Sequence, residues 1–213
     1  METRSLRLAG ARGLLKNHNF GRLLAAQFSA VTVIYGLSLA GAVLVEEQTQ
    51  SSAQTGLVIL SAIVPAFLGS LISGAVVDRW GRRRALLASH LGRALVAMAF
   101  WLGVQALPIG PALVLVYAVN VATALLSQFA TPAELALLPD LVGAQRLVPA
   151  NAIFQLSWLA GEGLGIILLS PVLIKAFGVP AVGLVGAALC FLAAVLVAAL
   201  PRNLAPARAS GRA

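Results

Sequence analysis

The sequence predicts an all-α membrane protein folded as a bundle of six transmembrane helices. Hydrophobic residues make up 60% of the chain and charged residues 10%, whereas a soluble domain carries about 25% charged residues. Six apolar runs reach the length of about 20 residues that a helix needs to cross a bilayer. The runs are continuous and do not alternate between apolar and polar residues, which favours helices over a transmembrane β-barrel.

The six predicted spans follow one another with polar connectors between them. They are residues 22–45, 55–77, 85–107, 112–131, 149–174 and 178–200. A basic segment, residues 1–21, precedes the first span. The apolar run of that span is too long for the core of a signal peptide, which has about 7–15 residues, so we expect a retained helix. Residues 201–213 are polar and rich in Pro, Ala and Arg, which predicts a disordered tail.

Lysine and arginine are divided unequally between two sets of connectors. Thirteen of the 15 lie in residues 1–22, 78–84, 131–148 and 201–213. The opposite connectors, residues 46–54, 108–111 and 175–177, contain only Lys175. The positive-inside rule therefore predicts a multi-pass protein of the cell inner (plasma) membrane with both termini in the cytoplasm. The net charge of +8 follows from this topology, and no basic face with interleaved aromatic residues indicates nucleic-acid binding.

Prolines and small residues mark further features of the spans. Pro65 lies near the middle of the second span and predicts a kink, because it removes a backbone donor. Pro132 and Pro139 predict that the fourth span ends near residue 131 and that a connector follows. Small residues four apart let helix backbones approach closely; such pairs are Gly69 with Ser73, Ser70 with Gly74, and Gly161 with Gly165. They predict either packing within the bundle or a sliding contact with a second bundle.

A charged segment between the second and third spans carries the strongest local pattern. Five of the seven residues from Asp78 to Arg84 are charged and must stay in water while their flanks enter lipid. The segment therefore predicts a tight cytoplasmic turn, and Gly81 permits it. The spacing Gly-x-x-x-Asp-Arg-x-Gly-Arg-Arg begins at Gly74. It resembles the signature loop between helices two and three of the major facilitator superfamily.

Two other segments resemble the bacterial exporter branch of that superfamily, which is related to siderophore and macrolide efflux proteins. Residues 17–28 resemble the start of its first helix, and residues 131–142 with Asn151-Ala152 resemble its connector between helices four and five. The superfamily fold has two six-helix bundles with a substrate cavity between them. The resemblance implies that this chain supplies the N-terminal bundle, and that it is a fragment, a subunit with a partner half, or a homodimerising half.

The resemblance also assigns roles to the charged turn. It implies a gating latch between two bundles on the cytoplasmic side, formed by Gly74, Asp78, Arg79, Gly81, Arg82 and Arg83. A carboxylate such as Asp78 at the membrane edge can hold arginines or the positive end of a helix. The alternative is that the arginines fix the topology and contact lipid phosphates.

Glu162 is the most informative single residue of the chain. It lies near the middle of the fifth span, too deep for its carboxylate to reach either membrane surface. An ionisable group at such a depth is a functional candidate by default, and we expect a coupling or substrate site there. The alternative is a protonated acid that is hydrogen-bonded within the bundle. Gly161-Glu162-Gly163-Leu164-Gly165 resembles the helix-five motif Gly-Pro-x-x-Gly-Gly of drug/proton antiporters, with Glu162 in place of the proline.

Other polar residues within the spans are candidates for the same site. Gln27 and Tyr35 share one helical face of the first span, and Asn120 lies in the fourth span. The resemblance implies that helices one, two, four and five line the cavity, so these residues would contact substrate; the alternative is hydrogen bonding between helices. Arg93 lies about 13 Å beyond Arg84. It either extends back to the cytoplasmic surface or pairs with a carboxylate or polar group on a neighbouring helix, and His90 lies one turn away.

The sequence therefore favours transport of a small molecule by a secondary active transporter, with proton-coupled efflux as the expected mode. Its expected partners are the lipid bilayer, a small-molecule substrate and a second six-helix half or a homodimer partner. The alternative is a non-transporting membrane protein, a truncated product or a scaffold for a relative. We expect no enzymatic activity, metal site or cofactor, because the chain has one cysteine, two histidines and no nucleotide-binding or hydrolase motif.

Overall fold

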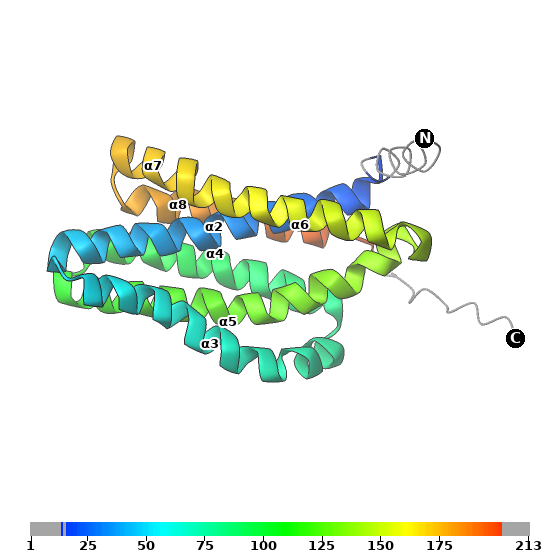
Figure 1. Ribbon diagram of the computed structural model, residues 1–213, viewed down its shortest axis with the longest axis horizontal. Coiled ribbons are helices and arrows are strands. Elements are labelled where there is room, and N and C mark those ends of the chain that lie inside the picture. Colours follow the sequence, from blue (N-terminus) through cyan, green and yellow to red (C-terminus); the bar gives the residue numbers. More distant parts are fainter. Residues whose placement is uncertain (1–13, 15, 202–213) are drawn as a thin grey trace, which may run out of the picture.

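A computed structural model describes residue 14 and residues 16–201, and all regular structure in these residues is helical. The predicted all-α fold is thereby confirmed (Figure 1). The elements are α2 (His18–Thr49), α3 (Ser52–Trp80), α4 (Arg82–Ala106), α5 (Ile109–Val142), the 3₁₀ turn η1 (Ala144–Arg146), α6 (Leu147–Gly163), the π-helix η2 (Leu164–Leu169), α7 (Ser170–Phe177) and α8 (Pro180–Ala198). Most of the predicted N-terminal segment, residues 1–13 and 15, and all but the first residue of the predicted disordered tail lie outside the described residues.

Six spans in the described residues are long and apolar enough to cross a membrane. Helices α2, α3, α4, α5 and α8 each form one span, and residues Ala144–Phe177 form the fifth through η1, α6, η2 and α7. Each predicted span corresponds to one of these six. The helices run roughly parallel to a common long axis (Figure 1), so their ends gather into two opposite faces.

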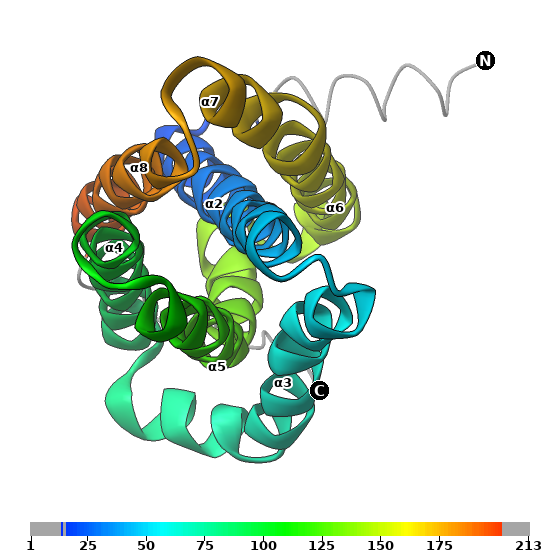
Figure 2. The same ribbon diagram turned by 90° about the vertical axis from the view of Figure 1, so that its left-hand side faces the viewer.

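Helix α2 lies at the centre of the bundle (Figure 2). It packs against α8, α6, α5 and α3, while α4 packs against α8 and α5. Helix α2 is consequently the most deeply buried span, whereas α3 and the α6–α7 span are the least covered. These two spans present large apolar side chains to the outside, among them Phe67, Leu71 and Ile167.

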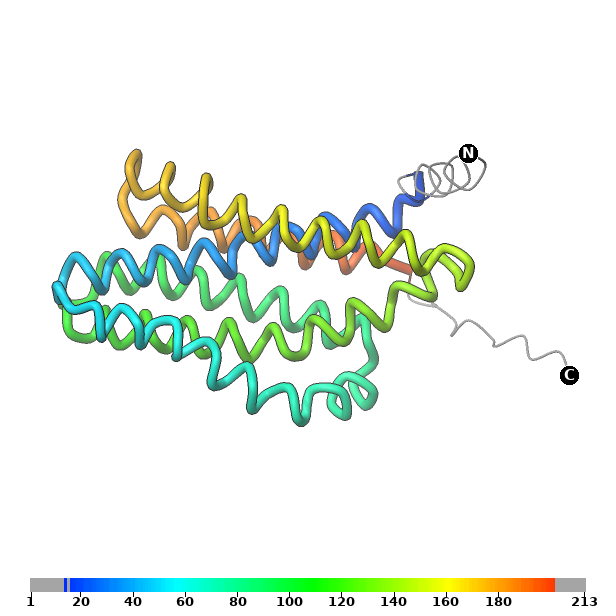
Figure 3. The backbone as a smooth tube through the Cα atoms, in the orientation of Figure 1, coloured from blue at the N-terminus to red at the C-terminus, as the bar shows by residue number. Residues whose placement is uncertain are grey.

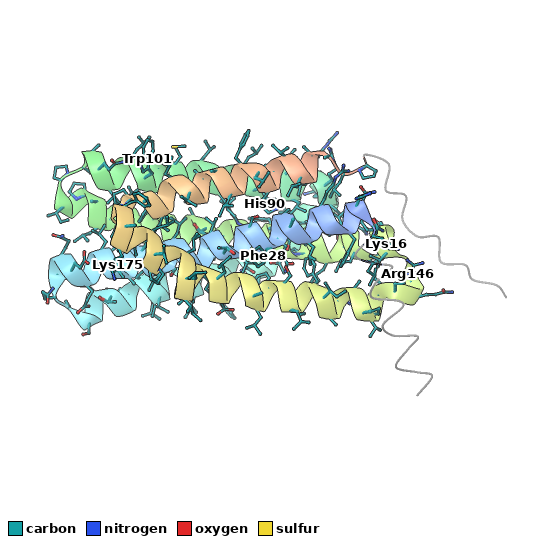
Figure 4. The ribbon with its side chains drawn as sticks, turned by 90° about the horizontal axis from the view of Figure 1, so that it is seen from above. Lys16, Phe28, His90, Trp101, Arg146 and Lys175 are labelled. Atoms are coloured by element: carbon teal, nitrogen blue, oxygen red, sulfur yellow. The ribbon has the colours of Figure 1, made fainter. Side chains whose placement is uncertain are left out.

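Most charged residues in the described part of the chain lie near the ends of the helices. Lys16 and Arg146 lie at one end of the bundle and Lys175 lies at the other (Figure 4). The α3–α4 turn lies at the same end of the bundle as Lys16. Helix α2 starts at that end, and α3 runs in the opposite direction and returns to it. The predicted orientation in the membrane depends on this separation of basic residues. The orientation itself stays a prediction.

Two connectors are shorter than the sequence predicts. Helix α3 continues to Trp80 and α4 begins at Arg82, so Gly81 alone forms the turn, with a φ of 85°. Helix α5 continues through Pro132 and Pro139 to Val142, which corrects the expectation that the helix ends near residue 131. Helix α3 contains Pro65 and curves away from the bundle toward its C-terminal end (Figure 3).

The small-residue pairs separate into two kinds. Gly69 and Ser73 are buried, and a Cβ on Gly69 would lie 3.0 Å from the Gln128 side chain of α5. Gly161 and Gly165 also pack inside the bundle, against α2. Gly74 differs, because a Cβ there would meet nothing within 4 Å. The pair Ser70 and Gly74 therefore faces out of the bundle.

Candidate functional site

A seam between α2 and α6 brings together two of the residues predicted to form the site. The Tyr35 side chain lies near the Glu162 carboxylate, which acts on it electrostatically, and Trp158 also lies near the Tyr35 phenol. Closer to the start of both helices, Gln27 Nε2 donates to the backbone carbonyl of Phe154 at 3.3 Å. In both cases the two residues are 127 positions apart in the sequence. An equal separation is expected when two helices run parallel and keep the same register along their contact.

Glu162 lies midway along the fifth span. It is as far from Leu147, where α6 begins, as from Phe177, where α7 ends, about 22 Å in each direction at about 1.5 Å per residue. Both Glu162 and Tyr35 are half-buried. A carboxylate beside a phenol at this depth can accept a hydrogen bond when ionised and donate one when protonated, so the pair is chemically suited to exchange a proton.

The backbone around Glu162 is shaped by close packing against α2. A Cβ on Gly165 would lie 2.5 Å from the carbonyl oxygen of Thr32, which leaves no room for a side chain. Just beyond, Ser170 Oγ donates to the carbonyl oxygen of Gly36 at 2.9 Å. The π-helix η2 begins two residues after Glu162, and single π-turns inside α-helices occur frequently at functional sites.

Gln27 and Asn120 are placed in the helix interfaces. Gln27 is 1% exposed, and its Oε1 atom is buried with no hydrogen-bond partner among the described residues. Asn120 is 5% exposed and its Nδ2 donates to the carbonyl oxygen of Val116, one turn earlier on α5. Asn120 faces Gly41 of α2. The structure therefore joins Gln27 to the seam of Tyr35 and Glu162, and places Asn120 at the α2–α5 contact.

Arg93 and His90 lie in the interior between α4 and its neighbours. Arg93 is 3% exposed, and its Nη2 donates to Ser127 Oγ of α5 at 3.1 Å. The carboxylate that interacts electrostatically with Arg93 is Glu134 of α5, itself 3% exposed. His90 is fully buried, and both of its ring nitrogens lack a hydrogen-bond partner among the described residues. Arg93 thus pairs inside the bundle, and its side chain does not extend to the surface.

Sequence reasoning missed Glu134 because it placed this residue in a connector. The spacing does contain the signal: Ser127 and Glu134 are seven residues apart, so on a continuous helix both lie on one face. Residues 131–142 are apolar apart from Thr131, Glu134 and Asp140, as a longer fourth helix requires. Trp158 was missed as well, although it lies one turn before Glu162.

The α3–α4 turn is anchored to the rest of the bundle through arginines. Arg82 Nη1 donates to the carbonyl oxygen of Ala136 at 2.8 Å and to Asp140 Oδ2 at 3.0 Å. Arg83 Nη2 donates to the carbonyl oxygen of Ala198, at the end of α8. The side chains of Asp78 and Arg79 are exposed. Among the described residues, no group of three or more His, Cys, Asp or Glu could hold a metal ion.

Comparison with known proteins gives the family. The enterobactin exporter EntS of Salmonella typhimurium (strain LT2) is 29% identical over 177 residues, which cover 80% of this chain and 42% of that protein. The enterobactin exporter EntS of Citrobacter koseri is 30% identical over 146 residues, covering 68% of this chain and 34% of that protein. The chain thus matches less than half of the length of these relatives, and no solved structure matches it. The profile of the Major Facilitator Superfamily matches residues 23–212, and the chain belongs to this superfamily.

Proposed function

We propose that this chain forms the N-terminal six-helix half of a secondary active exporter that moves a small molecule out of the cell in exchange for protons. Membership of the superfamily and the named exporters among its relatives support this proposal. The second bundle is supplied by a separate chain, by a second copy or by a continuation of this chain. Substrate binds near the middle of the membrane, and the two bundles rock around it to give alternating access.

One observation carries the proposal: Glu162 lies midway along the fifth span, near Tyr35 of α2. Glu162 is half-buried midway along one of the two least covered spans. Ionisable residues inside a membrane almost always face a bundle interior or a wet cavity. In the proposed cycle, Glu162 accepts a proton when the site opens outward and releases it when the site opens inward. Tyr35 orients the carboxylate during this exchange, and Trp158 in turn positions the Tyr35 phenol.

The faces left open by the bundle suit a second bundle. Helix α3 and the α6–α7 span carry exposed apolar residues along most of their length. On α3, Ser70 and Gly74 face outward, and a small-residue pair permits the close approach of another helix. Asp78 is exposed at the end of the same helix. We assign it to a cytoplasmic latch with the second bundle, while Arg82 holds the turn to α5 through Asp140.

The proposal is tested by a transport assay with and without a second bundle. The similar relatives are enterobactin exporters, so enterobactin is the first substrate to try. Cells that lack their own exporter would express this chain alone, a second six-helix half alone, or both. We expect efflux when both are present, and also from this chain alone if it pairs with itself. Membrane insertion without efflux in every combination and with every compound tried would instead favour the non-transporting alternative.

A further inference from the structure

A second acid lies inside the bundle, on α5, and has no part in the exchange proposed for Glu162. Glu134 is 3% exposed and lies about two turns before Val142, where α5 ends. That places it about 12 Å into the bundle at about 1.5 Å per residue. The apolar residues beside it on α5 belong to a buried cluster with residues of α2, α3 and α4. A carboxylate taken out of water is costly, and uptake of a proton removes its charge.

Arg93 compensates the charge of Glu134 only in part. The two residues act on each other electrostatically, but no ion pair joins them. The Arg93 guanidinium uses Nη2 for Ser127 Oγ, and its Nε is buried with no hydrogen-bond partner among the described residues. The other titratable groups around Arg93 are His90 of α4 and Cys190 of α8, both fully buried. Neither supplies a hydrogen-bond partner to Glu134 among the described residues.

Helix α2 brings Gln27 to the level of Glu134. The two helices run antiparallel, since α2 starts at the end of the bundle where α5 finishes (Figure 1). Gly41 of α2 faces Asn120 of α5. Gln27 comes fourteen residues before Gly41, and Glu134 comes fourteen residues after Asn120. Because both helices rise equally per residue, Gln27 and Glu134 lie at one level. Residues next to both belong to one buried cluster, so the helices remain in contact there.

The Gln27 side chain carries a buried acceptor that needs a donor. Gln27 is 1% exposed, and its Nε2 donates to the carbonyl oxygen of Phe154 on α6. Its Oε1 is buried and has no hydrogen-bond partner among the described residues. A buried acceptor without a donor is costly. A protonated carboxyl group offers an O–H donor, whereas an ionised carboxylate only accepts. A proton on Glu134 would therefore satisfy Gln27 as well.

The remaining charged groups near α5 are engaged or distant. Helix α5 packs against α2, α3, α4, α6 and η1. The buried residues of α2, α3 and α6 include no titratable side chain. Nearer the end of α5, Asp140 is bound to Arg82, and Arg146 of η1 is exposed. Glu162 lies beside Tyr35, about 12 Å further along α2 than Gln27. Arg93 and Gln27 are thus the groups that decide the charge of Glu134.

We propose that Glu134 is a proton-binding site separate from Glu162, with Arg93 as the partner of its ionised form and Gln27 as the partner of its protonated form. Hydronium passes a proton to a carboxylate oxygen of Glu134; an O–H bond forms and water is left. The carboxylic acid then donates to Gln27 Oε1, while Arg93 keeps its hydrogen bond to Ser127. Return of the proton to water restores the carboxylate and its attraction to Arg93. The site needs neither substrate nor a second bundle, so it does not depend on the proposed transport.

Infrared difference spectroscopy of the purified full chain in detergent tests the site directly. The pH is stepped between mildly acidic and alkaline buffer, a range in which exposed carboxylates stay ionised. A protonated carboxyl group shielded from water gives a C=O band at higher frequency than one in water. We expect such a band in the acidic state and its loss in the alkaline state. It should be absent from Glu134→Gln and present, with a shift, in Glu134→Asp. It should also remain in Glu162→Gln. A wild-type spectrum without the band, or a band that only Glu162→Gln removes, would overturn the proposal.

A second pair of variants tests the acceptor and leaves Glu134 in place. Gln27→Leu removes the amide that we assign to the protonated form. Asn120→Leu is the matched control, because it removes another buried amide of the α2–α5 contact, beside Gly41. We expect Gln27→Leu to move the band to higher frequency, since the O–H loses its acceptor, and Asn120→Leu to leave it unchanged. Equal spectra for the two variants would contradict the assigned hydrogen bond. This comparison holds even if Glu134→Gln fails to fold.

Discussion

Arg93 on α4 and Glu134 on α5 place opposite charges in the interior of the bundle, each 3% exposed, and each acts electrostatically on the other without a direct ion pair. Charged groups within a membrane protein are costly unless they are compensated. Each of these two residues therefore offsets part of the cost of burying the other. Ser127 extends the pair with one hydrogen bond to Arg93.

Removing one of these two charges is expected to destabilise the protein. Glu134→Gln leaves Arg93 with its hydrogen bond to Ser127 but without a nearby counter-charge, and we expect a loss of about 1–3 kcal/mol. Thermal unfolding in detergent, followed by circular dichroism, measures the effect. Glu47→Gln is the control, because Glu47 is exposed at a helix end. The double variant Arg93→Met with Glu134→Met, which removes both charges, is expected to regain much of the loss. A Glu134→Gln protein as stable as Glu47→Gln would contradict this electrostatic compensation.

Two glycines near Glu162 make a matched test of the α2–α6 seam. A Cβ at Gly165 would lie 2.5 Å from the Thr32 carbonyl oxygen, whereas a Cβ at Gly163 would meet nothing within 4 Å. Gly165→Ala is therefore expected to lower the free energy of unfolding by about 1–3 kcal/mol, the usual cost of overpacking. Gly163→Ala is expected to change it little. Equal effects on the unfolding transition in detergent would show that the two helices do not approach this closely.

The two aspartates of the α3–α4 turn are expected to respond differently. Asp140→Asn removes the ion pair with Arg82, in which the Arg82 side chain is 40% exposed but the Asp140 side chain only 5% exposed, so we expect a loss of stability of about 1–3 kcal/mol. Asp78→Asn changes an exposed residue, and stability is expected to stay within about 0.5 kcal/mol. Transport in the presence of a second bundle should nevertheless fall in Asp78→Asn, because Asp78 is assigned to the latch. Normal transport by this variant would remove that assignment.

The orientation in the membrane is open to a labelling experiment. In a Cys190→Ala background, Arg146→Cys and Glu47→Cys place one thiol at each end of the bundle, both at exposed positions. A membrane-impermeant thiol reagent added to intact cells should label the Glu47 position alone. The Arg146 position should react only after the membrane is permeabilised. The opposite pattern would reverse the predicted topology.

The sequence predicts six long apolar helices because the bilayer imposes one simple requirement, an apolar run of sufficient length. It also places Glu162 near the middle of the fifth of them, since that position follows from counting along the chain. The proximity of Glu162 to Tyr35 depends on the register between α2 and α6. That register is set by the close packing of the α6 and η2 glycines against the α2 backbone. Residue spacing along the chain does not predict which residues of two different helices meet.

The sequence fails where tertiary packing overrides a local rule. Pro132 and Pro139 predict a break, yet α5 continues through both, because its C-terminal part is buried in a cluster with residues of α2, α3 and α4. Glu134 was therefore assigned to water when it belongs to the interior. The turn at Gly81 shows the opposite case: a glycine was expected to permit a tight turn, and its positive φ confirms it.

The most direct test of the proposed mechanism compares Glu162→Gln with Glu47→Gln in proteoliposomes that contain the chain and its second bundle. Enterobactin movement would be recorded with and without an imposed pH gradient. Glu162→Gln is expected to insert normally and to lose the acceleration that the gradient gives, while Glu47→Gln keeps it. Gradient-driven movement that is unchanged in Glu162→Gln would show that the carboxylate beside Tyr35 does not couple transport to protons.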